Sequence, residues 1–194
     1  MSYCTGGVVM TDIIIVHSKI GDATNHWYKW LANNLILEGY NVTLFDLPVE
    51  ENDNLEQWVE RMKDQITVKK YETYFITHGF GTLASLKYIE EMNINHIEGL
   101  FSVAGFMDDA EEIDAYIDPE TKAIDYEIVK NKVDQFYGLC SKNDEYVSYL
   151  ETKRLMDTLN GVCKVTENGG HFIEDDGFTT FTILHGKMQS IMSK

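Results

Sequence analysis

The stretch that decides the fold is Phe75-Ile76-Thr77-His78-Gly79-Phe80-Gly81, in which an apolar β-type run ends and a helical pattern begins. The run from Tyr71 to Thr77 predicts a strand, and the apolar spacing from Thr82 to Met92 predicts a helix. A strand, a tight turn and a helix in this order are the setting of a nucleophile elbow, whose pattern is Gly-x-Ser-x-Gly. Here Gly81 fills the last position, Thr77 stands in the first, and Gly79 stands at the nucleophile.

Short β-type runs alternate with helical patterns on both sides of this turn. Further strands are predicted at Ile13–His17, Val42–Phe45, Ile97–Ala104, Gln135–Cys140 and Val162–Thr166, and further helices after the N-caps Asn25 and Asn54 and over Ser148–Leu159 and Phe178–Met192. The alternation predicts an α/β fold with a six-stranded, mostly parallel sheet and helices on both faces. Ligands of such sheets bind at the carboxyl ends of the strands.

The length of 194 residues predicts one domain, which we assign to 11–194, preceded by an N-terminal extension over 1–10 whose order the sequence leaves open. Little or no cap is expected over the strand ends. The stretch Asp108–Glu127 breaks the alternation with nine acidic residues and one lysine. It is either a small cap or a solvated acidic surface, the more usual role of such a run.

The charge of the chain excludes several classes of partner. Lys and Arg number 16 against 32 Asp and Glu, for a net charge of −16, which repels nucleic acids and anionic membrane surfaces. Three cysteines without short spacing indicate free thiols and a cytoplasmic location, with no zinc site. The sequence contains neither a phosphate-binding glycine loop nor a metal-ligand motif, and so predicts no cofactor and no metal.

Two later segments add to the significance of the turn at Gly79. Asp144 follows the predicted fifth strand, and His171 follows the sixth within Gly169-Gly170-His171-Phe172. The chain order of elbow, acid and histidine is that of α/β-hydrolases. The position of Asp144 before the Ser148 helix also suits a turn or helix-capping residue.

With these segments in place, the chain resembles the small, nearly capless α/β-hydrolases of the YdeN type, relatives of the retinoblastoma-binding serine hydrolases. The resemblance covers nearly the whole chain after about residue 12. It is carried by the following segments: Thr24-Asn25-His26-Trp27, Asp46-Leu47-Pro48, Trp58, the elbow, Ser141 to Val147, and Gly169 to Phe178.

The resemblance implies acyl-ester chemistry and a role for each matching residue. Asp144 corresponds to the triad acid, His171 to the triad base, and Gly79 to the nucleophilic serine. The Phe80 N–H corresponds to one oxyanion donor, and Ser18 or Lys19 would supply the second. The chain departs from the family pattern at three positions. Thr77 stands where the elbow pattern has glycine, Gly79 stands where it has the nucleophilic serine, and Ser18 stands where the family typically has glycine.

The loss of the serine leaves three explanations open. In the first, the chain is a pseudoenzyme that keeps the site for a small ester-like ligand or a protein partner. In the second, Gly79 is an engineered or variant residue of an active small serine esterase. In the third, another group does the chemistry, either the Ser18 hydroxyl or a water activated by His171. The first explanation predicts an inactive or very weakly active protein, and we expect a monomer.

Overall fold

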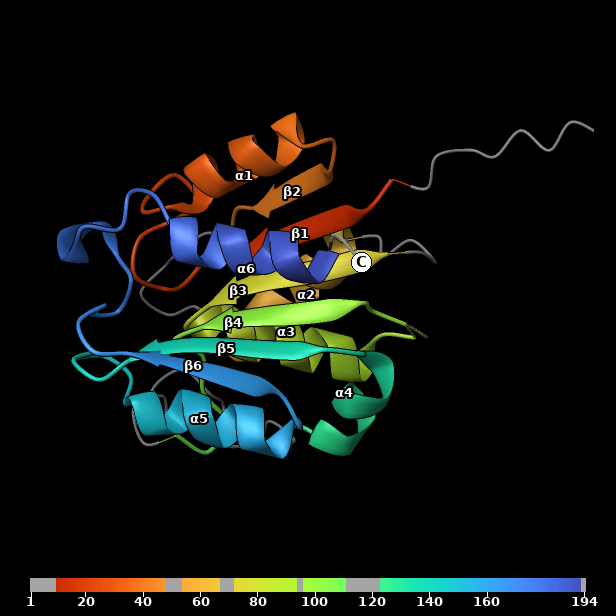
Figure 1. Cartoon of the computed structure of the whole chain (residues 1–194). Helices are drawn as coiled ribbons and strands as arrows, with labels where there is room; N and C mark the ends of the chain where they lie inside the picture. The colour runs from red at the N-terminus through yellow and green to blue at the C-terminus, as the bar shows by residue number, and fades with distance from the viewer. Residues whose placement is uncertain (1–9, 48–53, 67–71, 94–95, 111–122, 193–194) are drawn as a thin grey trace, which may run out of the picture.

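The computed structural model describes residues 10–47, 54–66, 72–93, 96–110 and 123–192. Six parallel strands form one sheet in the order β2-β1-β3-β4-β5-β6 (Figure 1). They are β1 (Asp12–Val16), β2 (Asn41–Phe45), β3 (Thr73–His78), β4 (Gly99–Val103), β5 (Phe136–Ser141) and β6 (Val162–Thr166). The predicted six-stranded parallel sheet is confirmed. The predicted N-terminal extension lies almost wholly outside the described residues.

Helices cover both faces of the sheet, as predicted. The helices α1 (Tyr28–Leu37) and α6 (Thr182–Met192) pack on one face, while α2 (Leu55–Gln65), α3 (Phe80–Glu91), α4 (Tyr126–Lys132) and α5 (Tyr149–Thr158) pack on the other. The central strands read as unbroken apolar runs because both of their faces are buried. In β1, Ile13 and Ile15 enter the core beneath α1 and α6, and Ile14 and Val16 enter the opposite core.

Several element boundaries differ from those predicted. The helix α3 begins at Phe80, directly after Gly79, and not at Thr82. The prediction that Asn25 caps α1 is wrong, because Trp27 is the N-cap and the Asn25 side chain accepts from the backbone of Asp22 instead. The predicted cap at Asn54 is confirmed, since its side chain and that of Gln57 form a reciprocal capping box.

The two ends of the acidic stretch are the only parts of it that the structure describes. Residues 111–122, the larger part of the stretch considered as a cap or a solvated surface, lie outside the described ranges. The stretch ends in α4, which the sequence reading missed and which Asp125 caps through its side chain. The final helix, α6, begins at Thr182 and not at the predicted Phe178, because residues 178–181 are irregular. A separate 3₁₀ turn (Glu174–Asp176) lies before them.

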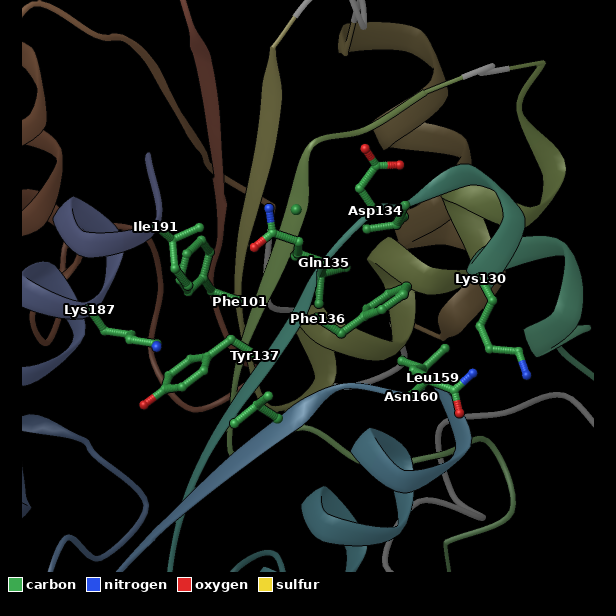
Figure 2. Close-up of a pocket in the computed structure, with 14 residues that line it drawn as sticks. Phe101, Lys130, Asp134, Gln135, Phe136, Tyr137, Leu159, Asn160, Lys187 and Ile191 are labelled. Carbon is green, nitrogen blue, oxygen red and sulfur yellow. The ribbon is translucent and has the colours of Figure 1, made fainter. Parts of the chain in front are cut away.

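A hollow of about 430 Å³ lies at the amino ends of β4, β5 and β6, opposite to the strand ends where ligands are expected (Figure 2). Phe101 and Tyr137 line it from one face of the sheet, and Phe136 and Leu159 line it from the other. The hollow therefore extends around the amino edge of the sheet.

Among the residues that the structure describes, none of the helices has the length and apolar character needed to span a bilayer.

Candidate functional site

Gly79 forms the turn between β3 and α3 in a backbone conformation with φ 51° and ψ −121°. Side chains with a Cβ rarely adopt such a positive φ, and strained residues of this kind occur at functional sites. The Gly79 N–H donates to the carbonyl of Val103 on β4 at 2.8 Å, which anchors the turn to the neighbouring strand. The turn therefore has the geometry of a nucleophile elbow, although no side chain projects from it.

The elbow pattern has glycine on both sides of the nucleophile position, and this chain has Thr77 on one side and Gly81 on the other. A Cβ on Gly81 would lie 2.2 Å from the backbone oxygen of His17, so only glycine allows α3 to approach β1 this closely. Thr77 faces a buried polar cluster instead. Its hydroxyl lies 2.8 Å from that of Thr82 and 3.0 Å from the Phe101 carbonyl oxygen.

His171 and Asp144 are brought together at the same end of the sheet. The His171 Nδ1 lies 2.9 Å from Asp144 Oδ2, and the two side chains are 3% and 1% exposed. Because a carboxylate accepts, His171 donates through Nδ1 and turns its Nε2 toward the elbow. That Nε2 lies 3.3 Å from the point where a Cβ on Gly79 would stand.

Asp144 also holds its own turn through the carboxylate oxygen that does not contact His171. Its Oδ1 accepts from the backbone N–H groups of Tyr146 and Val147 at 2.8 and 2.9 Å. The ring of Tyr146 lies 5.2 Å from that of His171, centroid to centroid, and Tyr146 is 53% exposed. The Asp144 carboxylate is therefore held by its own turn through Oδ1 and contacts the His171 imidazole through Oδ2.

Polar side chains anchor the loop that carries His171. The Asp176 carboxylate accepts from the His171 N–H at 2.8 Å. Asn143 Oδ1 accepts from the Gly170 N–H at 2.9 Å, and the Ser141 hydroxyl accepts from Gly169 N–H at 2.6 Å. The sequence reading assigned no role to these three side chains, because short polar residues in loops are common and carry no spacing signal.

The loop after β1 contains the two residues proposed as the second oxyanion donor. Ser18 N–H donates to the hydroxyl of Tyr28 at 3.1 Å, and the Ser18 hydroxyl lies 3.1 Å from both the carbonyl oxygen and the N–H of Ile20. The Ser18 N–H is thus bonded to α1 through Tyr28, and its hydroxyl is bonded within the loop to Ile20. The Lys19 ammonium lies 5.1 Å from the ring centroid of Phe80, which carries the first proposed donor.

Three other histidines at this end use both ring nitrogens to join backbone segments. His17 donates through Nδ1 to the Ser18 carbonyl at 2.6 Å and accepts from Leu47 N–H at 3.0 Å. His26 likewise bridges the Ile20 carbonyl and the N–H of Glu174. His78 lies between Tyr28 and the His171 carbonyl. His17 and His26 each use one nitrogen to donate to a carbonyl and the other to accept from a backbone N–H.

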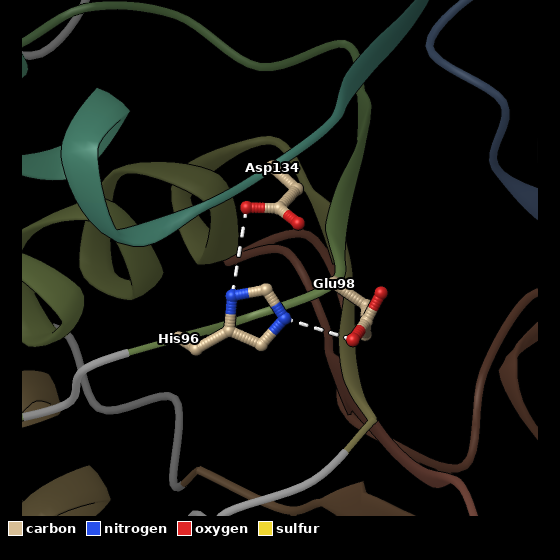
Figure 3. Close-up of side chains that lie close together, drawn as sticks. All are labelled: His96, Glu98 and Asp134. Atoms are coloured by element: carbon tan, nitrogen blue, oxygen red, sulfur yellow. Dashed lines mark hydrogen bonds and ion pairs between the residues drawn. The ribbon is translucent and has the colours of Figure 1, made fainter.

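A second cluster of titratable groups lies at the opposite end of the sheet (Figure 3). His96 Nε2 is 2.8 Å from Glu98 Oε1, and His96 Nδ1 is 3.5 Å from Asp134 Oδ1. The hydrogen bond to Glu98 raises the pKa of His96. With a carboxylate facing each nitrogen, the cluster has the arrangement of an imidazolium ion pair joining the segments before β4 and β5.

The buried histidines make stability depend on pH. Burial lowers the pKa of His17 below its ordinary value of 6.5. Below about pH 6.5 the His17 side chain therefore binds a proton more readily in the unfolded chain than in the folded chain, and the unfolding free energy decreases as pH falls. We expect the unfolding free energy, measured with urea at pH 7.5, 6.5 and 5.5, to decrease through this window. One such proton contributes a slope of up to about 1.4 kcal/mol per pH unit.

Two variants separate this effect from the general titration of an acidic protein. His17→Gln should be less stable at pH 7.5 but lose less stability between pH 6.5 and 5.5. His96→Gln should lose more over the same interval, because the raised pKa of His96 stabilises the folded state as pH falls. Identical slopes for the chain and for His17→Gln would contradict the assignment.

Comparison with known proteins bears on the family and the fold of the chain. The sequence profile described as "Serine hydrolase" matches residues 13–189. The chain belongs to the serine hydrolase family. A curated relative, the "Putative hydrolase YdeN" of Bacillus subtilis (strain 168), is 25% identical over 183 residues, which cover 94% of this chain and 96% of YdeN.

Solved structures show the same fold in proteins described as hydrolases and esterases. The crystal structure of the ydeN gene product from B. subtilis superposes with a TM-score of 0.87 at 25% identity, covering 95% of this chain and all of that one. A putative YdeN-like hydrolase from Pectobacterium atrosepticum gives 0.68 at 17% identity and covers 95% and 91%. A Pyrococcus furiosus esterase gives 0.66 at 13% and covers 94% and 81%. The last two comparisons concern the fold alone.

Proposed function

We propose that this serine hydrolase family protein performs no acyl-enzyme chemistry and holds a small ester-like ligand at the Asp144–His171 end of the sheet. Any hydrolysis there is very slow and proceeds through a water that His171 activates as a general base. The observation that carries the proposal is Gly79, which occupies the elbow beside His171 Nε2 without a nucleophile.

The contacts of the neighbouring hydroxyl support this reading over a relocated nucleophile. Ser18 Oγ donates to the Ile20 carbonyl and accepts from the Ile20 N–H, so both of its roles are used within the loop. A nucleophilic serine needs its proton directed to the base instead. The Nε2 of His171 is left to act on water or to accept a hydrogen bond from a ligand.

A fluorophosphonate, which forms a covalent adduct with activated serine hydroxyls, tests the proposal directly. We expect the intact mass of the chain to remain unchanged after incubation, whereas Gly79→Ser gains one adduct on residue 79. Binding is measured on the unmodified chain by the shift of the His171 imidazole signals when ethyl butyrate is added. Stoichiometric labelling of the unmodified chain, at Ser18 or elsewhere, would overturn the proposal.

A further inference from the structure

Four buried groups form a continuous hydrogen-bonded chain beneath the candidate site. Ser18 N–H lies 3.1 Å from the hydroxyl oxygen of Tyr28, that oxygen lies 2.6 Å from His78 Nδ1, and His78 Nε2 lies 2.7 Å from the His171 carbonyl oxygen. Tyr28 and His78 are fully buried, and Ser18 and His171 are 1% and 3% exposed. Such a network is strengthened by the low dielectric around it.

The direction of every bond in this chain is fixed by its two ends. A backbone N–H only donates and a carbonyl only accepts, so Tyr28 Oη accepts from Ser18 and His78 Nε2 donates to His171. In a neutral His78 ring this leaves Nδ1 as the acceptor, so the Tyr28 hydroxyl donates its hydrogen bond to Nδ1. Burial raises the pKa of Tyr28 and, with His171 nearby, lowers that of His78, which keeps both groups neutral.

This series of hydrogen bonds joins the three segments that make the site. Ser18 follows β1, His78 immediately precedes Gly79 at the end of β3, and His171 follows β6. Tyr28, the first residue of α1, is the only member outside these strand ends. The Cβ of Ser18 and the Nε2 of His171 also flank the position that a Cβ on Gly79 would occupy, at 3.2 and 3.3 Å.

We infer that Tyr28 and His78 are positioning residues that fix the backbone of His171, and through it the imidazole, relative to residue 79. The inference rests on the proposed site but requires no activity of the unmodified chain. Removing the Tyr28 hydroxyl leaves both the Ser18 N–H and His78 Nδ1 buried without this partner, a costly state that loop movement relieves. The hydrogen bond from His171 Nδ1 to Asp144 should loosen as a result.

Nuclear magnetic resonance on the ¹⁵N-histidine-labelled chain tests the inference without catalysis. In the unmodified chain, His78 should carry its proton on Nε2 with Nδ1 unprotonated, and the His171 Nδ1 proton should exchange slowly. In Tyr28→Phe we expect that proton to broaden or exchange rapidly. Tyr88→Phe is the matched control, because it removes another fully buried hydroxyl that donates to a backbone carbonyl, of Ile66, far from the site.

The same pair of variants is then placed in the Gly79→Ser background and assayed on p-nitrophenyl acetate. Tyr28→Phe should lower kcat by up to about 100-fold with little change in KM, because small displacements of a base are amplified in the rate. Tyr88→Phe should leave kcat unchanged.

Two results would overturn the inference. One is a His78 proton on Nδ1 in the unmodified chain, a measurement that needs no variant and so does not depend on whether Tyr28→Phe folds. The other is a His171 signal that is the same in Tyr28→Phe and Tyr88→Phe. Phosphonate labelling of the unmodified chain, by contrast, would overturn the proposed function and leave the positioning role intact.

Discussion

Gly79→Ser should raise the rate of p-nitrophenyl ester hydrolysis by about 10³-fold over the unmodified chain. Removing the nucleophile of a complete triad costs about 10⁶-fold, and losing one oxyanion donor costs about 10²- to 10³-fold. Because the Ser18 N–H, one of the two candidates for the second oxyanion donor, already donates to Tyr28, we expect a weakened oxyanion hole and only partial recovery of the full rate. The Cβ that carries the new hydroxyl would lie 3.3 Å from His171 Nε2, which places the hydroxyl within reach of a hydrogen bond to that nitrogen.

Gly79→Ala is the matched control for this gain. It introduces the same Cβ at the same positive φ, without the hydroxyl, so any strain is shared and only the chemistry differs. Adding His171→Ala to Gly79→Ser should return the rate to that of the unmodified chain. A folded Gly79→Ser protein no faster than Gly79→Ala on every ester tested would refute the expectation.

The nearest obstacle to a serine at position 79 is Ser18, whose Cβ would lie 3.2 Å from the new Cβ. Contacts this close oblige the neighbour to shift by a few tenths of an ångström. The double variant with Ser18→Gly removes that contact at the cost of the hydroxyl bonds to Ile20. We expect it to be faster than Gly79→Ser alone, and less stable.

Gly81→Ala should cause a severe loss of stability, although it adds only one methyl group. Its Cβ would lie 2.2 Å from the His17 oxygen and 2.8 Å from that of Val16, and both are backbone atoms of a central strand segment that cannot rotate away. Overpacking against flexible side chains costs about 1–3 kcal/mol, and a rigid backbone should exceed that range. Urea unfolding should show a loss of at least about 3 kcal/mol, or no folded protein.

Gly186→Ala supplies the comparison within the same molecule. Gly186 lies in α6, is exposed, and would place its Cβ in open space. Alanine there should stabilise the protein by about 0.5–1 kcal/mol, because glycine is a poor residue in a helix interior. Similar stability for Gly81→Ala and the unmodified chain would show that α3 does not contact β1 as closely as the structure indicates.

The fold was predictable because its signals are local and repeated. The Ile13–Val16 run has no polar residue on either face, which identifies a strand covered on both sides, and glycines mark the turns around it. The helix α4 was not predictable from the same signals, since only Val129 among its seven residues is buried. The wrong cap at Asn25 has a similar cause, because its side chain serves a turn with Asp22 that competes with helix capping.

The acid and base positions were accessible from sequence because they follow strands whose ends converge. The sequence does not reveal which side chains form hydrogen bonds with one another around these positions. Tyr28 reads as one more apolar residue of an amphipathic helix, yet its hydroxyl joins Ser18 to His78. Pairings between segments so far apart in the chain leave no periodic trace.

The buried frame beneath the site has an evolutionary consequence. Its bonds run through backbone groups and through Tyr28 and His78, and none depends on a side chain at position 79. Glycine and serine codons of the forms GGY and AGY differ by one base. Under the proposed function, a lineage carrying this scaffold passes between the glycine and serine forms of the elbow by a single mutation, in either direction, with the same buried frame around it.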